Sequence, residues 1–180
     1  MVLERHCSDL SRLSTEAVKI GFGGAVGNKG AVAMRFRLHG RSVCFVNAHL
    51  PSGTKAVDER NGAYHEIATA LSTSLRFARE CRLFEHEMTV WLGDLNYRVQ
   101  LPNEQVRDAV RVSNLPSILE HDQLSLAREA GQAFAELQEA PIAFPPTYKF
   151  DAGTDRYDSS EKQRVPSWTD RVLFRGEGVR

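Results

Sequence analysis

The 180 residues predict one domain of the α+β class, and three features of the sequence support this. Two apolar segments, 31–38 and 42–50, are separated by a short His-Gly-Arg turn. A long segment with helical spacing follows at 57–80, and shorter apolar runs lie at 88–92 and 168–174. Because hairpins and helices mix without regular strand–helix alternation, the sequence favours an α+β fold or a helix-flanked β-sandwich.

The strands are predicted from the spacing of apolar residues. In 31–38, Val32, Met34 and Phe36 alternate with small or charged residues, which is typical of a half-buried strand. Residues 42–50 are apolar on both faces at first, and the tight turn before them predicts an antiparallel hairpin. The run 88–92 predicts a short third strand ending in Gly-Asp, and 168–174 return to a strand.

The helices are predicted from an apolar stripe and from capping residues. The long helix carries its stripe at Tyr64, Ile67, Ala68, Leu71, Leu75 and Ala78. Shorter helices follow, with Asn103 expected to cap the first, Pro116 in the first turn of the second, and Asp122 capping a third that ends near Gly131. The stretch 141–167 holds four prolines and is expected to be loop.

Composition narrows the class of protein. The 23 basic and 23 acidic residues cancel, so any anion site must come from local clustering of charge. The three cysteines show no metal or disulfide spacing, and Cys44 lies in an apolar run, which favours a buried thiol in a reducing cytosol. No apolar stretch approaches the roughly 20 residues that span a bilayer, and the first residues do not form a signal peptide. We therefore expect a soluble intracellular domain, or a piece of one.

Polar side chains follow two of the predicted strands at the points where they end. His49 could donate to a phosphoryl oxygen, Asp94 could orient or deprotonate water, and Asn96 could hold that water in line. Each also has a plain structural explanation: a satisfied strand-end histidine, an Asx turn, and, for Asp170, an ordinary strand-edge acid. Their occurrence together, each at a strand end, favours metal-assisted attack on a phosphate ester.

Two further segments could bind an anion. The glycine-rich stretch 21–30 includes Lys29 and would let backbone amides approach a phosphate, but it lacks Walker spacing and also suits a hairpin tip. Phe22 and Val26 in this stretch could dip into a membrane surface, or could be ordinary exposed apolar residues. In the loop-rich segment, cations and a tyrosine suit a phosphate, although composition alone favours solvated charges paired with neighbouring acids. Those groups are Tyr148, Lys149, Lys162 and Arg164, and the acids are Asp151, Asp155, Asp158 and Glu161.

Taken together, these segments resemble the inositol polyphosphate 5-phosphatases, a family with the DNase I-like fold of the endonuclease/exonuclease/phosphatase superfamily. The likeness covers about residues 18 to 175, and 101–104 and 122–124 make it closest to the synaptojanin branch. The two long signatures, Trp91–Arg98 and Arg164–Leu173, are specific, whereas the glycine stretch adds little by itself. The other matching segments are Gly27–Val32, Val46–Leu50, Phe144–Asp151 and Tyr157–Arg164.

The resemblance implies a four-layer α/β sandwich and Mg²⁺-dependent removal of the 5-phosphate from phosphatidylinositol 4,5-bisphosphate and related inositol polyphosphates. It implies that Asp94 activates water, Asn96 holds the scissile phosphate and His49 stabilises its charge. Asp170 would orient a site histidine. For the loop-rich segment the resemblance reverses the reading from composition, because it makes Tyr148, Lys149, Lys162 and Arg164 a clamp for the 4-phosphate. Asn28 and Lys29 would lie near the substrate mouth, and the 22–26 loop would touch lipid.

The resemblance also implies what this chain lacks. The family's principal Mg²⁺ ligands precede the matching region and its closing histidine segment follows it, so we expect the metal ligands outside this chain. Residues 1–180 are thus expected to be the central part of a single catalytic domain, without its N- and C-terminal strands and inactive alone. The expected setting is the cytoplasm, peripheral at the cytosolic face of membranes, with a phosphoinositide or soluble inositol polyphosphate as partner and no nucleic acid.

Two alternatives stay open. One is another phosphodiesterase of the DNase I-like fold, such as a nuclease or sphingomyelinase. The pairs Tyr148-Lys149 and Lys162/Arg164 argue against it, as does the lack of a basic stripe for a nucleic acid backbone. The other is a truncated, non-catalytic phosphoinositide-binding module.

Overall fold

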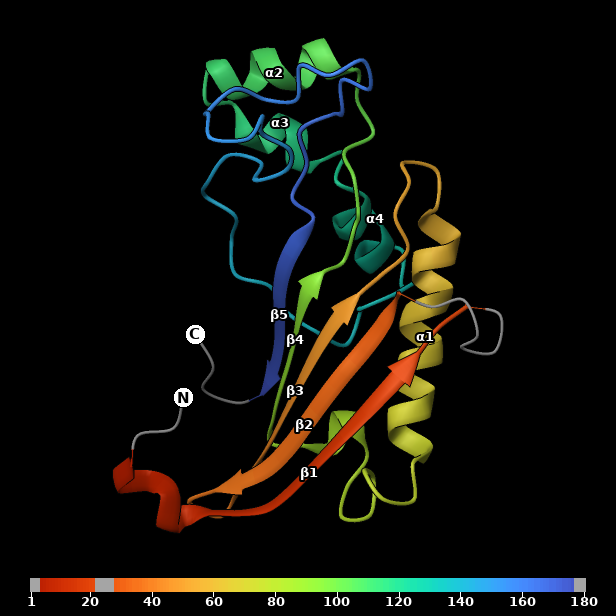
Figure 1. Cartoon of the computed structure of the whole chain (residues 1–180), viewed down its shortest axis with the longest axis vertical. Helices are drawn as coiled ribbons and strands as arrows, with labels where there is room; N and C mark the ends of the chain where they lie inside the picture. Colours follow the sequence, from red (N-terminus) through yellow and green to blue (C-terminus); the bar gives the residue numbers. More distant parts are fainter. Residues whose placement is uncertain (1–3, 22–27, 177–180) are drawn as a thin grey trace.

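A five-stranded mixed sheet forms the centre of the molecule (Figure 1). The computed structural model describes residues 4–21 and 28–176. The strands lie in chain order: β1 (Leu10–Lys19), β2 (Gly30–Leu38), β3 (Arg41–His49), β4 (Met88–Asp94) and β5 (Asp170–Gly176). The pair β3–β4 is parallel and the other three pairs are antiparallel. The parallel pair requires a crossover, which helix α1 (Val57–Thr73) provides.

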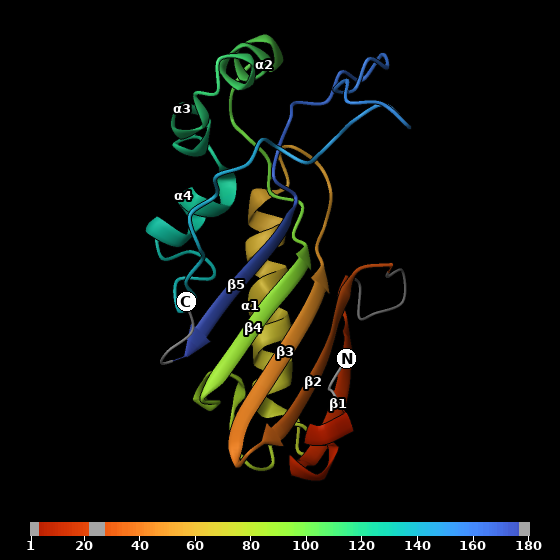
Figure 2. The same cartoon turned by 90° about the vertical axis from the view of Figure 1, so that its left-hand side faces the viewer.

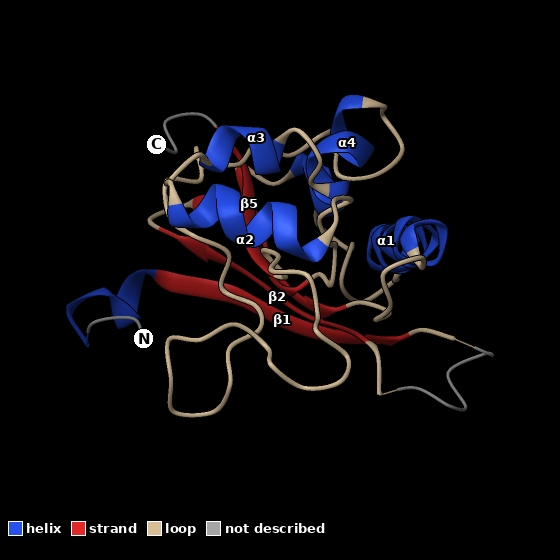
Figure 3. Cartoon of the chain, turned by 90° about the horizontal axis from the view of Figure 1, so that it is seen from above, coloured by secondary structure: helices blue, strands red, loops and turns tan. Residues whose placement is uncertain are grey.

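The helices leave one face of the sheet uncovered by described residues. Helix α1 and α4 (Gln123–Glu129) lie over one face, while α2 (Asn103–Arg111) and α3 (Leu115–Leu119) lie beyond the ends of β3 and β4 (Figures 2 and 3). Short 3₁₀ helices occur at Glu4–Asp9 and Leu83–Glu85. The described residues thus supply one sheet and one helical layer, in agreement with a partial-length DNase I-like domain.

The main core lies between the sheet and α1. Trp91 from β4, Tyr64 from α1 and Phe134 from the segment after α4 are fully buried and pack with ring centroids 4.1 to 5.3 Å apart. A second apolar cluster, which includes Val106, Ile118 and Trp168, lies under α2 and α3. The two clusters fix the loops beyond the strand ends to the sheet.

The opposite face of the sheet is apolar and exposed in the described part of the chain. Val32 and Met34 from β2 are 58% and 44% exposed, and Val172 from β5 is 57% exposed. These residues alternate along their strands with the buried residues, so both faces of the sheet carry apolar side chains, which is typical of a sheet covered on both sides. A second layer is expected over this face.

A buried ion-pair network fixes β5 to α4. Arg171 donates to Asp122 at 2.8 Å and makes a two-point contact with Glu139 at 2.6 and 2.7 Å. Asp122 also accepts from the backbone N–H of Ser125 at the start of α4, which confirms its predicted capping role. Arg171 directly follows Asp170, so the network anchors the start of β5 to α4.

Most predicted elements are present, with three corrections. Helix α1 ends at Thr73 rather than near residue 80, because Ser74 is extended and its hydroxyl accepts from the N–H of Phe77, which leaves Leu75 95% exposed. Pro102, and not Asn103, occupies the N-cap of α2; the Asn103 side chain instead donates to the carbonyl of Gln163. Strand β1 was not predicted at all.

Candidate active site

The ends of three adjacent strands bring the predicted acidic and basic residues together. His49 at the end of β3 is in register with Asp94 at the end of β4, and Asp94 is in register with Asp170 at the start of β5. The Nε2 atom of His49 lies 3.4 Å from Oδ2 of Asp94. The predicted convergence of these strand ends on one rim is therefore present, and the name rim is used below for His49, Asp94 and Asp170.

A glycine lets the strands approach closely at the rim. Gly93 has φ +124°, and a Cβ atom there would lie 2.1 Å from the carbonyl oxygen of Ala48. No side chain fits at that distance, so only glycine allows β4 to place Asp94 directly beside His49. The Gly-Asp pair at the strand end therefore has a geometric cause.

Lys29 adds a positive charge to the rim. Its Nζ atom lies 2.5 Å from His49 Nε2 and donates to it when the imidazole is neutral with its proton on Nδ1. The same Nε2 atom lies 3.4 Å from the Asp94 carboxylate. His49 therefore lies between the Lys29 ammonium and the Asp94 carboxylate.

The environment of Asp94 raises the pKa of its carboxyl group. Burial is the main cause and the negative charge of Asp170 adds to it, while His49, the backbone N–H of Asn96 and Arg98 oppose the shift. That N–H donates to Asp94 Oδ1 at 3.1 Å and fixes the orientation of the carboxylate. A carboxylate that accepts a proton more readily than usual suits a group that orients or deprotonates water.

Asn96 lies next to Asp94, but its amide is bound within the protein. Its Nδ2 donates to the carbonyl of Leu50 at 3.0 Å and its Oδ1 accepts from Arg98 at 2.6 Å, and the side chain is buried. Its backbone is in the left-handed region, with φ +59°, which asparagine tolerates. In this structure Asn96 ties the end of β3 to Arg98.

Arg98 connects the rim to the loop-rich segment, a role that is not expected from its sequence alone. Its guanidinium carbon lies 4.2 Å from the ring centroid of Tyr148, and its Nε donates to the carbonyl of Asn96 at 3.1 Å. The cation–π contact holds the tyrosine ring beside the strand ends. The available signal was its place in the same Trp91–Arg98 signature as Asp94.

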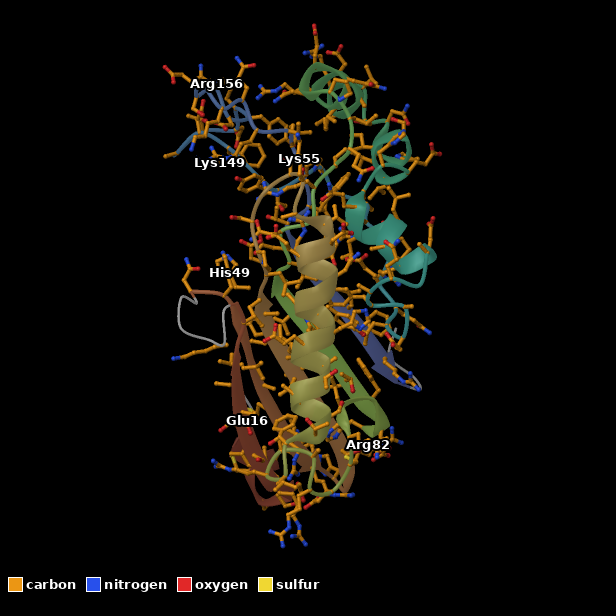
Figure 4. All side chains as sticks on the ribbon, turned by 90° about the vertical axis from the view of Figure 1, so that its right-hand side faces the viewer. Glu16, His49, Lys55, Arg82, Lys149 and Arg156 are labelled. Atoms are coloured by element: carbon orange, nitrogen blue, oxygen red, sulfur yellow. The ribbon has the colours of Figure 1, made fainter. Side chains whose placement is uncertain are left out.

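Three of the four expected clamp residues line one cavity. The cavity has a volume of about 390 Å³, and its walls include Arg98, Tyr148, Lys162, Arg164 and the loop 52–54. Lys149 does not line it, and lies among the loops beyond the strand ends with Lys55 and Arg156 (Figure 4). This cavity, the clamp cavity, thus brings Tyr148, Lys162 and Arg164 together and leaves Lys149 outside.

The acids of this loop neutralise only part of its charge. Asp158 accepts from the Arg164 guanidinium at 3.2 Å, and hydrogen bonds from Ser160 and from the Arg164 backbone hold its pKa well below the usual range. Asp151 pairs with Arg156 instead of with a clamp residue. The pairing expected from composition therefore holds for Arg164, and among described residues Lys162 has no such partner.

A buried arginine fixes the loop that forms the other wall of the cavity. Arg60 of α1 donates to the carbonyl of Gly53 at 2.7 Å and to the side chain of Gln123 at 2.6 Å. Gln123 in turn donates to the carbonyl of Thr54 at 2.8 Å and accepts from the N–H of Arg98 at 2.9 Å. Helices α1 and α4 thereby hold the 52–54 loop against Arg98.

The remaining predicted site residues lie at the edge of the described region. Asn28 is exposed, and within the described part of the chain no hydrogen bond or ion pair joins it to the rim. The 22–26 loop, expected to touch lipid, lies outside the described residues. Among the described helices, none has the length and apolar character needed to cross a bilayer.

The rim does not by itself form a complete Mg²⁺ site. Mg²⁺ prefers six oxygen ligands in octahedral geometry, and the rim offers the carboxylates of Asp94 and Asp170. In residues 4–21 and 28–176, the one group of three side chains with metal-ligand spacing is His6, Asp9 and His39, at the other end of the sheet. The location of the principal ligands outside this chain stays a prediction.

Comparisons with known proteins agree on the family. The model of the endonuclease/exonuclease/phosphatase family 2 matches residues 1–180. Inositol-1,4,5-trisphosphate 5-phosphatase 1 of Schizosaccharomyces pombe is 48% identical over 161 residues, which are 89% of this chain and 15% of that protein. Human synaptojanin-1 is 46% identical over 171 residues, 95% of this chain and 11% of that protein.

A solved structure shows the same fold. The inositol polyphosphate 5-phosphatase domain of spSynaptojanin, in complex with inositol (1,4)-bisphosphate and calcium, matches with a TM-score of 0.88 and 43% identity. The match covers 97% of this chain and 49% of that chain, so this chain spans about half of the solved domain. The chain belongs to the endonuclease/exonuclease/phosphatase family 2, and within this family it is similar to inositol polyphosphate 5-phosphatases of the synaptojanin type.

Proposed function

We propose that this chain forms the substrate-binding half of a catalytic domain that removes the 5-phosphate from phosphatidylinositol 4,5-bisphosphate and soluble inositol polyphosphates. The observation that carries the proposal is the rim beside the cavity of Arg98, Tyr148, Lys162 and Arg164. The relatives support it: one is named for inositol 1,4,5-trisphosphate and another for phosphatidylinositol 4,5-bisphosphate. The solved domain holds inositol (1,4)-bisphosphate. This compound is what remains when inositol 1,4,5-trisphosphate loses its 5-phosphate.

In this mechanism the rim residues act on the 5-phosphate, which is the group that is hydrolysed. Asp94 orients the attacking water and accepts its proton, for which its raised pKa suits it. His49 and Lys29, which already contact one another, place positive charge and hydrogen-bond donors where negative charge accumulates on the phosphoryl oxygens. Burial raises the pKa of Asp94, and the charge of Asp170 adds to this shift. Asn96 holds the strand end and Arg98 in place.

The neighbouring clamp cavity binds the 4-phosphate, which is not removed. Lys162 and Arg164 supply charge and Tyr148 supplies a hydroxyl, a set that matches phosphate oxygens. Arg98 fixes the tyrosine ring, so the 4-phosphate would meet a preformed wall. Lys149 lies outside this cavity, and in the proposal it contacts a more distant part of the headgroup.

The metal and the cellular setting are also part of the proposal. The solved relative holds calcium, and we assign Mg²⁺ as the working cation, which neutralises phosphate charge when bound. Water, substrate oxygens and residues outside this chain would complete its coordination. The proposed location is the cytosolic face of membranes, where the lipid substrate is presented, and nucleic acid is not proposed as a ligand.

One observation favours a second function for the chain as it stands. It spans 49% of the solved domain, and its rim offers two carboxylates for a cation that prefers six ligands. A polypeptide with the clamp cavity but without a complete metal site would bind phosphoinositide headgroups without hydrolysing them. This non-catalytic binding module is the alternative to be tested.

The test replaces the matching segment of the solved spSynaptojanin domain with these 180 residues. Mg²⁺-dependent phosphate release from vesicles containing phosphatidylinositol 4,5-bisphosphate is then measured for the chimera and for the chain alone. We expect turnover by the chimera and vesicle binding without turnover by the chain alone. A chimera that folds, binds the vesicles and releases no phosphate would contradict the catalytic proposal.

A further inference from the structure

A second, larger cavity lies at the other end of the sheet from the rim. It has a volume of about 1000 Å³ and is formed by the start of β1, the end of β2 and the segment after α1. Arg35 lies five residues along β2 from Gly30, the register partner of His49, which is about 17 Å at the rise of a β-strand. The charged residues that line it, called the arginine cavity below, are Arg12, Arg35, Arg37, Arg76, Arg79 and Glu80.

The arginine cavity concentrates positive charge in a chain that has none overall. Five guanidinium groups and one carboxylate line it, whereas the whole chain has a formal net charge of zero. Glu80 lies 3.6 Å from Arg12, 3.8 Å from Arg35 and 3.4 Å from Arg37, so one carboxylate is shared among three cations. The excess of four positive charges remains for an external anion to neutralise.

The arginines divide into a structural one and available ones. Arg35 is buried and donates to the carbonyls of Phe77 at 2.5 Å and Arg12 at 3.3 Å, so it ties the segment after α1 to β1. Arg76 and Arg79 are exposed, and among the described residues their guanidinium groups form no hydrogen bond or ion pair. Their donors are available to a ligand at the mouth of the cavity.

An irregularity in β1 shapes the same cavity. The register with β2 shifts between Ser11 and Ser14, so that Arg12 and Leu13 together face a single residue of β2. Arg12 has φ +58°, which is uncommon for a residue other than glycine, and its side chain is 70% exposed. A bulge of this kind redirects a side chain out of the regular ladder, and residues in such backbone conformations concentrate at functional sites.

We propose that the arginine cavity binds a compact polyanion that carries two or more phosphate groups, at a site separate from the rim. Guanidinium groups form paired, planar hydrogen bonds with phosphate oxygens, and three exposed ones from different segments can address neighbouring phosphates together. The volume is at the upper end of small-ligand pockets and exceeds what one phosphate fills. The proposal stands on this geometry and does not depend on the reaction at the rim.

The test is a titration of the 180-residue chain with inorganic tripolyphosphate, followed by NMR. The amide signals of 11–14 and 76–80 report on the arginine cavity, so binding at the rim is recognised separately by its own signals. We expect saturable shifts in these two segments. The absence of shifts there at millimolar tripolyphosphate would overturn the proposal.

Variants give opposite expected effects. Arg76→Ala combined with Arg79→Ala should weaken tripolyphosphate binding by about a hundredfold, because each charge-assisted hydrogen bond contributes roughly a factor of ten. Glu80→Gln removes the competing carboxylate and should tighten binding. Arg111→Ala is the control, since Arg111 is an exposed arginine on α2 that pairs with Asp108. It should leave the affinity unchanged.

Three results would contradict the proposal. One is unchanged affinity in the double variant while its spectrum stays that of the folded chain. Another is an equal loss in Arg111→Ala, which would mean that only general charge attraction is measured. The third is equal or tighter binding of pentaglutamate, which would replace the phosphate ligand by an acidic peptide.

Discussion

Asp94 is the proton acceptor in the proposed mechanism, and its carboxyl group is half-buried beside Asp170. Because burial and the charge of Asp170 raise its pKa above the ordinary value of 3.8, the folded state binds this proton more tightly than the unfolded chain does. The free energy of unfolding therefore falls as pH rises from that ordinary value through the raised pKa. At neutral pH the ionised carboxylate destabilises the fold that holds it.

Asp94→Asn should therefore separate stability from activity. The amide keeps an oxygen for the N–H of Asn96 but carries no charge, so we expect a higher Tm at pH 7. Loss of the proton acceptor should lower turnover of the chimera by at least about a hundredfold. Thermal denaturation and phosphate release measure the two effects. A lower Tm with retained turnover would contradict both the destabilising effect of the Asp94 charge and its role as proton acceptor. The control is Asp108→Asn, because Asp108 is an exposed acid on α2.

Lys162 tests the assignment of the clamp cavity. Lys162→Ala should reduce the chimera's kcat/KM for phosphatidylinositol 4,5-bisphosphate by about tenfold, since one charged contact to the 4-phosphate is lost. The loss on a substrate with a 5-phosphate but no 4-phosphate should be smaller. Equal losses on both substrates would contradict the clamp. Lys55→Ala, an exposed lysine that does not line the cavity, should leave both values unchanged.

Some site residues could be read from the sequence and others could not. His49, Asp94 and Asp170 were predictable because the end of a strand is a local feature and neighbouring strand ends share a rim. Arg60 and Gln123 were not, because they are 63 residues apart and their hydrogen bond exists only after α1 and α4 have packed. Charged residues in a helix give no local signal that they will be buried.

At the scale of elements, Gly93 decides how closely β4 approaches β3. Gly93→Ala would place a Cβ 2.1 Å from the carbonyl oxygen of Ala48 in a backbone conformation that alanine rarely adopts. We expect a loss of about 3 kcal/mol or more in the free energy of unfolding, measured by urea denaturation. In contrast, Gly62→Ala in α1 meets no atom within 4 Å and should stabilise the chain by about 0.5–1 kcal/mol. Similar effects in the two variants would contradict the close approach.

The elements that were predicted wrongly show where periodicity fails. Strand β1 was missed because its bulge between Ser11 and Ser14 interrupts the alternation of faces on which the prediction depends. The long helix was predicted too far because Leu75 and Ala78 continue its spacing by chance. The helix ends where the Ser74 hydroxyl binds a backbone N–H, and serine is a weak sequence signal for a helix end.

At the scale of the whole molecule, the uncovered apolar face governs behaviour in solution. Val32, Met34 and Val172 are strongly exposed on the side of the sheet away from the helices. We expect the chain alone to bind hydrophobic dyes and to self-associate, and the triple variant Val32→Thr, Met34→Gln, Val172→Thr to do both less. Analytical ultracentrifugation and dye fluorescence check this. A wild-type chain that stays monomeric without binding dye would contradict it.

The overall fold and family could be predicted because two signatures, Trp91–Arg98 and Arg164–Leu173, are specific in sequence; the first begins within β4 and the second ends within β5. The sequence does not predict the position of Lys149 outside the clamp cavity or the role of Arg98. Both depend on how the loop 141–167 folds back against the strand ends. Loop geometry is set by contacts with distant segments, such as the backbone pairing of Tyr148 with Ser167.

In the proposed mechanism the rim of His49, Asp94 and Asp170 directs hydrolysis at the 5-position while the clamp cavity holds the 4-phosphate. The most direct measurement is the identity of the lipid that the chimera forms from phosphatidylinositol 4,5-bisphosphate, determined by chromatography of the deacylated product. We expect phosphatidylinositol 4-phosphate, with its formation abolished by Asp94→Asn. Formation of phosphatidylinositol 5-phosphate, or turnover that survives Asp94→Asn, would contradict the account.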